Sequence, residues 1–250
     1  MTLDLRDVPK ERQTYEMCLE SVQEDGRQLK FVDEKYQTRE LYMEAVRKYG
    51  CALKYVKDQT PEICLEAVKN SGAALQYVQE QTLEICLEAV KKTWWVLQFA
   101  TKQTPEMCFE AVRQNPLALE YAKEQTPEVC LEAVKQNGLA LQFVQEQTSE
   151  ICLEAVKDSG WALQYVKDQT PEICLEAVKQ NGMAIGSIPK RRQTLHIAIA
   201  ALKQDPDCRR YLADKFRKPE VYKAAGYDYK PEDLAPSRSG TKRERTEPRH

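Results

Sequence analysis

The sequence predicts an all-α solenoid of about nine 22-residue helix-turn-helix repeats with helical caps. A Gln-Thr pair recurs at intervals of 22 residues over six consecutive steps, and at intervals of 24 at either end. The stretch QTPEICLEAVKQNG, from Gln169 to Gly182, returns almost unchanged from Gln125 and from Gln59. A period in the twenties is typical of repeat proteins, in which each unit buries its apolar side only against its neighbours. The pairs begin at Gln13, Gln37, Gln59, Gln81, Gln103, Gln125, Gln147, Gln169 and Gln193.

The first helix of each repeat has a clear start signal. In the repeat at Gln59, Thr60 is a good N-cap, Pro61 suits the first helical position and Glu62 complements the positive end of the helix dipole. The apolar residues then follow helical spacing, as a buried stripe requires. This stripe consists of Ile63, Cys64, Ala67 and Val68.

A turn and a second, shorter helix complete the repeat. We expect Gly72 to end the first helix in the left-handed conformation that glycine adopts easily. The second helix is predicted over Ala73–Glu80, with Ala74, Leu75 and Val78 on one side. Because neither helix is long enough to persist alone in water, stacking must stabilise both.

The chain divides into a lead-in (residues 1–12), eight tandem repeats (13–192), a capping repeat and helix (193–226), and a charged tail expected to be disordered (227–250). We see no signal-peptide pattern and no apolar run long enough to span a bilayer. The nine cysteines favour a reducing compartment. We therefore expect a cytoplasmic protein that does not contact membranes.

Seven cysteines share one repeat position, which raises the question of metal or disulfide chemistry. Equivalent positions in stacked repeats should lie ~10 Å apart, beyond the ~7 Å limit for a disulfide. CxxC spacing is also absent from the sequence. We predict that the column is buried, reduced and free of metal, and that it fills a narrow gap between helices. Its members are Cys18, Cys64, Cys86, Cys108, Cys130, Cys152 and Cys174, with Tyr42 and Ala198 at the equivalent positions of two other repeats.

Charged residues form columns on the opposite face of the first helix. Glu62, Glu66 and Lys69 are spaced as helix-stabilising pairs, each contributing about 0.2–0.5 kcal/mol. An alternative is that rows of carboxylates imitate a phosphate backbone and block a nucleic-acid-binding protein. A second alternative is direct nucleic-acid binding through the basic C-terminal end. That end contains Lys190, Arg191, Arg192, Arg209, Arg210, Lys215, Arg217 and Lys218.

The residue after the turn glycine varies most among the repeats. It is predicted to face outward from the second helix, beside a column of glutamines. A constant framework with a variable, aromatic-rich row is how repeat proteins make binding surfaces, and tryptophan often dominates binding energy. The alternative is that Trp95 and Trp161 only cover the seams between repeats. The candidate binding residues, centred on the irregular repeat KKTWWVLQFATK, are Trp94, Trp95, Trp161, Lys91, Lys92, Phe99, Leu117 and Leu139.

The unit QTPEICLEAVKQNG followed by ALQYVKDQ resembles short helical repeats catalogued as a domain of unknown function and seen in tandem in bacterial and viral proteins. The resemblance covers roughly Gln13 to Arg192. It implies the helical-repeat fold and brings no activity with it.

Catalytic signatures are missing from the sequence. Its two histidines, His196 and His250, lie in no known catalytic pattern, and neither a phosphate loop nor a metal-ligand motif is present. We therefore expect a non-enzymatic scaffold without cofactors. Its predicted function is to bind a macromolecule, with a protein preferred to a nucleic acid, as an adaptor or an inhibitor.

Overall fold

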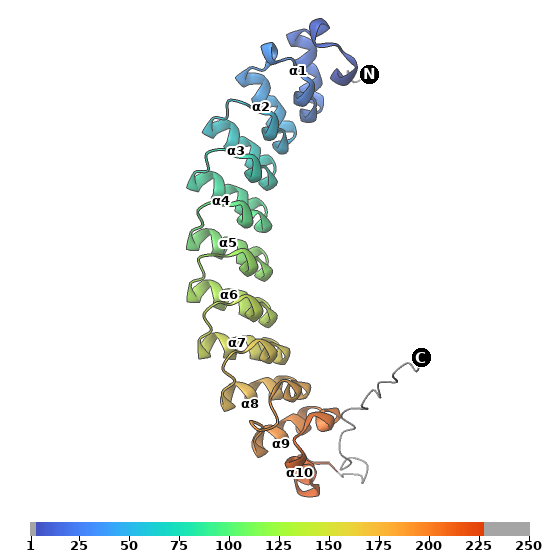
Figure 1. The fold of residues 1–250 in the computed structure, drawn as a ribbon, viewed down its shortest axis with the longest axis vertical. Helices are drawn as coiled ribbons and strands as arrows, with labels where there is room; N and C mark the ends of the chain where they lie inside the picture. The colour runs from blue at the N-terminus through green and yellow to red at the C-terminus, as the bar shows by residue number, and fades with distance from the viewer. Residues whose placement is uncertain (1–3, 228–250) are drawn as a thin grey trace, which may run out of the picture. The chain divides into compact units, whose positions relative to one another are not determined.

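Each repeat folds as an α-helix of ten residues followed by a 3-10 helix of six residues, in the computed structural model, which describes residues 4–227 (Figure 1). Every regular element within these residues is a helix, and the predicted all-α helical-repeat fold is confirmed. The α-helices are α1 Tyr15–Glu24, α2 Arg39–Lys48, α3 Pro61–Asn70, α4 Leu83–Lys92, α5 Pro105–Gln114, α6 Pro127–Gln136, α7 Ser149–Asp158, α8 Pro171–Gln180, α9 Leu195–Gln204 and α10 Pro219–Ala224.

The 3-10 helices follow the α-helices along the chain, and short ones occupy the lead-in. They are η1 Leu5–Asp7, η2 Lys10–Arg12, η3 Gly26–Phe31, η4 Glu34–Tyr36, η5 Gly50–Tyr55, η6 Gly72–Tyr77, η7 Trp94–Phe99, η8 Pro116–Tyr121, η9 Gly138–Phe143, η10 Gly160–Tyr165, η11 Gly182–Ser187, η12 Pro206–Tyr211 and η13 Asp214–Phe216. The tail that we expected to be disordered, apart from Tyr227, lies outside the described residues.

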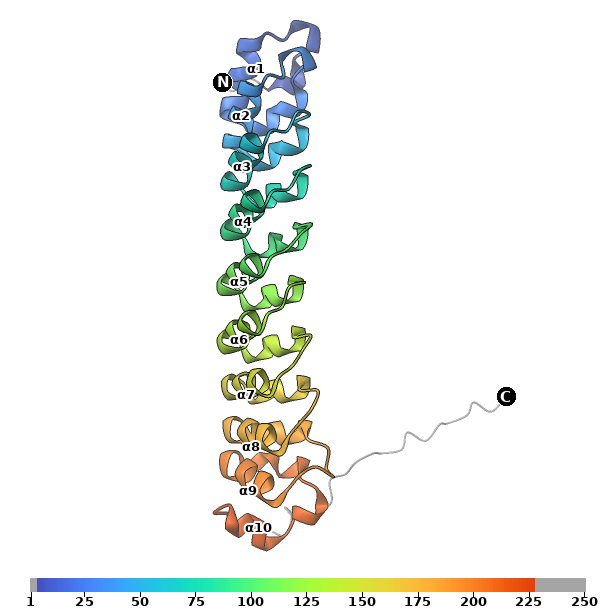
Figure 2. The ribbon, with the colours of Figure 1, turned by 90° about the vertical axis from the view of Figure 1, so that its left-hand side faces the viewer.

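The chain forms two compact units, each described here by itself. The first unit is Met1–Gln136 with Phe143–Gln145, and the second is Asn137–Gln142 with Glu146–His250. Within each unit, successive α-helices lie side by side in one row and the 3-10 helices lie in a second row beside them (Figure 2). Each repeat therefore contacts mainly its neighbours, as expected for a repeat protein.

The start of the first helix is as predicted. The Thr60 hydroxyl accepts a hydrogen bond from the backbone N–H of Ile63, and Pro61 is the first helical residue. Ile63 and the rest of the predicted apolar stripe are buried. The second helix was placed correctly in the sequence but is a 3-10 helix over Gly72–Tyr77, shorter than expected.

The turn glycine serves a purpose that we did not predict. Gly226 is the one glycine of the described residues with a positive φ, so the left-handed conformation expected at Gly72 is wrong. A Cβ at Gly72 would instead lie 2.6 Å from the carbonyl oxygen of Ala89 in the next repeat. Glycine is therefore required because neighbouring backbones approach closely. The same carbonyl contact recurs at Gly26, Gly50, Gly138, Gly160 and Gly182.

Two side chains bind neighbouring repeats together, and the sequence analysis assigned neither of them. Gln59 Nε2 donates to the carbonyl oxygens of Leu53 and Tyr77, at 3.4 and 2.9 Å, while its Oε1 accepts from the backbone N–H of Gln79 at 3.0 Å. At the end of α3, Asn70 Oδ1 accepts from the N–H of Gly50 at 2.7 Å. These side chains satisfy backbone groups that the short helices leave unpaired.

Substituting a close-approach glycine should destabilise the protein. In Gly160→Ala, the new Cβ would lie 2.6 Å from the carbonyl oxygen of Ala177, so we expect the free energy of unfolding to fall by about 1–3 kcal/mol in urea titrations. Gly160→Asn should lower the free energy of unfolding more than Gly160→Ala does. The control is Gly186→Ala, whose Cβ would lie 3.3 Å from the Tyr211 ring. Because this contact is longer than the one at Gly160, the loss of stability should be smaller. An asparagine variant more stable than the alanine variant would instead indicate a left-handed turn.

The glutamine column offers a matched pair of variants. Gln147 Oε1 accepts from the N–H of Lys167 at 2.9 Å, whereas the buried Oε1 of Gln169 has no partner because Pro189 stands where a donor N–H would be. Gln147→Met should therefore lower the free energy of unfolding by about 2–4 kcal/mol. The loss in Gln169→Met should be smaller than this by about 1–2 kcal/mol. Urea titrations of both variants give the comparison. Equal losses of stability in the two variants would contradict a stabilising role for the hydrogen bond from the Lys167 N–H to Gln147 Oε1.

Candidate functional site

The outward side of each 3-10 helix is set by its three-residue turn. In η6, Gly72, Leu75 and the following Val78 lie on one line and are buried, whereas Ala73 is half-buried and Gln76 is exposed. We call the first-turn position and the position three residues later the variable face. In the first unit it comprises Arg27, Lys30, Cys51, Lys54, Ala73, Gln76, Trp95, Gln98, Leu117 and Glu120; in the second it comprises Leu139, Gln142, Trp161, Gln164, Met183 and Gly186.

Several glutamines of the variable face have a local role. Gln98 Nε2 donates to the carbonyl oxygen of Trp95 at 3.0 Å, and Gln76 bonds in the same way to the carbonyl of Ala73 at 2.9 Å. Because these amides bond to backbone within their own repeat, they hold the turn that presents the first position. In η6, η7, η9 and η10 the second position is always glutamine, so differences among these repeats are concentrated at the first position.

Most of the candidate residues of the first unit gather on η7 and η8, which are neighbours. The Trp94 ring lies 6.2 Å from the ring of Tyr121, and the Trp95 ring packs edge-on against Phe99 at 5.8 Å. Leu117 is 40% exposed, and both tryptophans are half-buried. We call Trp94, Trp95, Phe99, Leu117 and Tyr121 the aromatic patch.

Trp94 and Trp95 differ in what they contact. Trp94 stands at the turn-glycine position, and its contact with Tyr121 reaches the next repeat, so it covers a seam there. Trp95 contacts Phe99 within its own 3-10 helix. Of the two tryptophans in this repeat, Trp95 therefore contributes less to the contact between repeats.

The two candidate lysines lie at the end of α4. Lys91 Nζ pairs with Glu88 at 3.0 Å, and this pair raises the pKa of Lys91. Arg47 and Arg113 pair in the same way with the glutamate three residues earlier, so Lys91 belongs to a column common to many repeats. Lys92 is exposed and is the last residue of α4, the position that Lys48 occupies in α2.

The remaining candidates lie in the second unit. Trp161 is 45% exposed, the highest exposure among the three tryptophans, all of which are described. Its carbonyl oxygen accepts from Gln164 Nε2 at 3.1 Å, as in the other repeats. Leu139 is half-buried.

The glutamate columns are solvated, as predicted. Glu154 and Lys157 pair at 2.6 Å, but their side chains are 31% and 53% exposed. Exposed pairs of this kind contribute about 0.3–0.5 kcal/mol each. The columns are thus regular and well supplied with cations.

The basic C-terminal end is less continuous than the sequence implied. Lys190, Arg191 and Arg192 are exposed. Arg217, however, is buried and donates from a terminal nitrogen to the carbonyl oxygen of Arg210 at 2.8 Å, so its inclusion in an exposed basic surface was wrong. His196 is exposed on α9, whereas His250 lies outside the described residues.

The seven cysteines of the column are buried free thiols, as expected. Packing is not their whole role, because Cys64 Sγ donates to Gln59 Oε1 at 3.5 Å. The exception at Tyr42 follows the same rule, since its hydroxyl donates to Gln37 Oε1 at 3.1 Å. Among the described residues, no cluster of histidine, cysteine or acidic side chains has the arrangement of a metal site.

The chain belongs to the family described as a domain of unknown function, DUF4116. Eight overlapping matches to this family cover residues 14–60, 38–83, 60–104, 82–126, 104–148, 126–170, 148–193 and 170–217. Neither a curated protein nor a solved structure matches the chain. Within residues 4–227, no helix is long and apolar enough to cross a membrane.

Thiol reactivity should separate Cys51 from the column. Cys51 is half-exposed, whereas burial raises the pKa of Cys64 and raises that of Cys174 to about 11. We expect one of the nine thiols to react quickly with a thiol reagent at pH 8, because buried sites react only after local opening. The Cys51→Ser variant should lose the fast phase. Fast labelling of several thiols would contradict this.

The same burial predicts an alkaline loss of stability. Above about pH 9, the ordinary thiol pKa, the unfolded chain releases protons that the folded chain keeps until its raised pKa, about 11 for Cys174. The free energy of unfolding should therefore fall as the pH rises from about 9 to about 11. Urea titrations across this range measure it, and the Cys174→Ala variant should show a shallower fall. An identical slope in that variant would contradict the assignment.

Proposed function

We propose that this protein is a non-enzymatic scaffold that binds a protein partner through the variable face, with the aromatic patch as its centre. The observation that carries this proposal is that the scaffold residues are nearly constant while the first position of the variable face changes from repeat to repeat. A rigid framework with a changing outer row is suited to recognising one extended partner.

The composition and the position of the aromatic patch support its role as the centre of the binding surface. It combines two half-buried tryptophans with the exposed Leu117, and it lies where the turn glycine is replaced by Trp94 and Pro116. Tryptophans surrounded by other apolar side chains are the residues that most often dominate interface energy. The exposed lysines Lys91 and Lys92 stand at the end of the preceding helix and favour an acidic margin on the partner.

A protein partner accounts for these features better than a nucleic acid does. The cations named beside the aromatic patch are Lys91 and Lys92, and Lys91 already pairs with Glu88, whereas nucleic-acid affinity depends mainly on contacts between cations and phosphates. The glutamate columns are interleaved with cations, which weakens them as an imitation of a phosphate backbone. Whether binding makes the protein an adaptor or an inhibitor depends on the partner.

The test compares variants against a partner isolated by cross-linking from the native host. Trp95→Ala should weaken binding by about 2 kcal/mol or more, because a central anchor is lost. The control Glu66→Ala changes a half-exposed side chain of the glutamate columns, which pairs with Arg47 at 3.4 Å, and should leave the affinity within about 0.5 kcal/mol of the original. Titration calorimetry measures both variants, and circular dichroism checks that they fold.

Three results would redirect the proposal. An unchanged affinity in Trp95→Ala and in Trp94→Ala would overturn the aromatic patch as the centre. A steep loss of binding as the salt concentration rises, together with a loss of binding in the Lys190→Ala and Arg191→Ala variants, would indicate a nucleic acid. Loss of binding only after neutralising several glutamates would indicate phosphate mimicry.

A further inference from the structure

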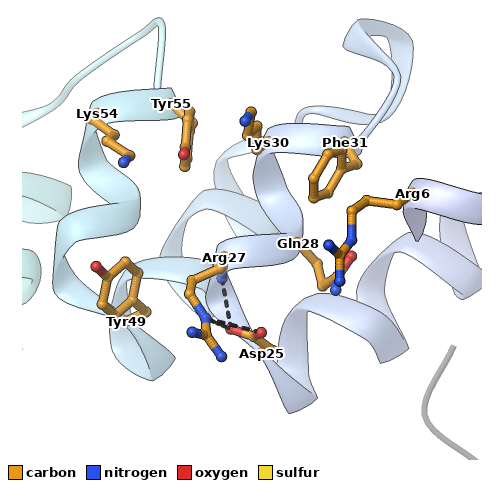
Figure 3. Close-up of a pocket in the computed structure, with 9 residues that line it drawn as sticks. All are labelled: Arg6, Asp25, Arg27, Gln28, Lys30, Phe31, Tyr49, Lys54 and Tyr55. Atoms are coloured by element: carbon orange, nitrogen blue, oxygen red, sulfur yellow. Dashed lines mark hydrogen bonds and ion pairs between the residues drawn. The ribbon is translucent and has the colours of Figure 1, made fainter. Parts of the chain in front are cut away.

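A hollow of about 320 Å³ lies in the first unit, between the lead-in and the first two repeats (Figure 3). It is separate from the aromatic patch. Its volume is at the lower end of the range of about 300–1,000 Å³ that is usual for small-molecule sites. The residues that line it are Arg6, Asp25, Arg27, Gln28, Lys30, Phe31, Tyr49, Lys54 and Tyr55.

The hollow results from a change of residue type on the variable face. Lys30 of η3 and Lys54 of η5 occupy the position that holds Gln76 and Gln98 in later repeats. Arg27 occupies the first position of η3. The same backbone geometry that presents polar amides elsewhere therefore presents three cations here.

The hollow has an excess of positive charge. Four cations line it, together with one carboxylate, Asp25. Arg27 binds that carboxylate through Nε, at 2.9 and 3.1 Å, and lowers the pKa of Asp25. Both side-chain bonds use Nε, and Figure 3 shows the Arg27 guanidinium beside Asp25, on the side of the hollow opposite Lys30 and Lys54. Arg6 pairs with Asp4 at 2.7 Å.

The two lysines are not neutralised by acidic side chains. Lys30 Nζ lies 5.5 Å from the centre of the Phe31 ring, and Lys54 Nζ lies 4.7 Å from the centre of the Tyr55 ring. Among the described residues, neither lysine pairs with a carboxylate. Lys54 also hydrogen-bonds Tyr55. Cations without a carboxylate partner in a concave site concentrate the positive field and attract anions.

Aromatic rings stand among these cations. Phe31, Tyr49 and Tyr55 all line the hollow, and Tyr49 is 38% exposed. Figure 3 shows Tyr49 beside Arg27 and Tyr55 beside Lys54. Aromatic rings interleaved with cations are the combination that binds a planar base next to a phosphate.

We infer that this hollow binds a nucleotide, with its phosphate held by Lys30 and Lys54 and its base packed against Tyr49 and Tyr55. A phosphate presents several acceptor oxygens, both in a free nucleotide and within a strand, so it can contact two cations at once. The nucleotide is either free in solution or part of a single strand, and both have the same recognised chemistry. This site shares no residue with the aromatic patch, so it stands independently of the proposed protein partner.

Titration calorimetry with the full chain tests the inference. The probes are ATP, decauridylate, inorganic phosphate and decaglutamate. We expect ATP or decauridylate to bind, and inorganic phosphate to bind at least about tenfold more weakly because it lacks a base to stack. Tighter binding of decauridylate would assign the site to a strand, and tighter binding of ATP would assign it to a free nucleotide.

Variants separate the roles of charge and ring. Lys30→Ala with Lys54→Ala should raise the dissociation constant for the preferred probe at least about tenfold. The matched control is Lys69→Ala, an exposed lysine of α3 that does not line the hollow. Tyr55→Ala should weaken the nucleotide about tenfold and leave inorganic phosphate unchanged. Tyr55→Phe should restore nucleotide binding because the ring is kept.

Three outcomes would overturn the inference. They are failure of both nucleotide probes to bind, equal affinity for nucleotide and inorganic phosphate, and tighter binding of decaglutamate than of either nucleotide probe. Unchanged nucleotide affinity in the lysine double variant, with the fold intact by circular dichroism, would also overturn it. None of these results bears on the Trp95→Ala test of the aromatic patch.

Discussion

The structure depends on one side chain per repeat, the glutamine of the Gln-Thr pair. Gln103, for example, donates to the carbonyl oxygens of Leu97 and Tyr121 and accepts from the N–H of Lys123 and from Cys108 Sγ. Two consecutive 3-10 helices are thereby joined through one amide. Short 3-10 helices leave many backbone groups unpaired, and burying these groups unpaired would cost about 1–3 kcal/mol each. The repeated glutamine satisfies them and sets the spacing of the second row.

This constraint leaves the outer side of each 3-10 helix free to vary. Glycine at the turn and the glutamine each contact the backbone of a neighbouring repeat, and the buried thiol donates to that glutamine, so few residue types fit at these positions. The first position of the variable face tolerates many residue types, and it ranges from Arg27 through Ala73 to Trp95. Recognition and stability are therefore carried by different residues of one repeat, which lets the surface change without altering the stack.

Departures from the repeat pattern have separate physical meanings. Tyr42 replaces a cysteine but keeps its hydrogen bond to the glutamine, so it preserves the joint. Pro189 removes an N–H and leaves the buried Gln169 Oε1 unpaired. Trp94 places a Cβ at the position where glycine, in other repeats, lets neighbouring backbones approach closely. The Trp94 ring lies against Tyr121 of the next repeat. Lys30 and Lys54 replace glutamine on the variable face and bring positive charge to the hollow that they line.

The sequence by itself determined the helical repeat, the first helix from its Thr-Pro start, and the buried stripe, because these follow from local capping and apolar spacing. It also singled out Trp95 and Leu117, since variation among repeats is visible without coordinates. It missed the hollow, although Lys30 and Lys54 in a glutamine column were a readable signal. Only the tertiary structure decided the purpose of the turn glycine, the role of the cysteine thiol, and the packing of Arg6 against Phe31 of the first repeat. Each depends on which atoms of neighbouring repeats come within a few ångströms, and a one-dimensional pattern does not contain that distance.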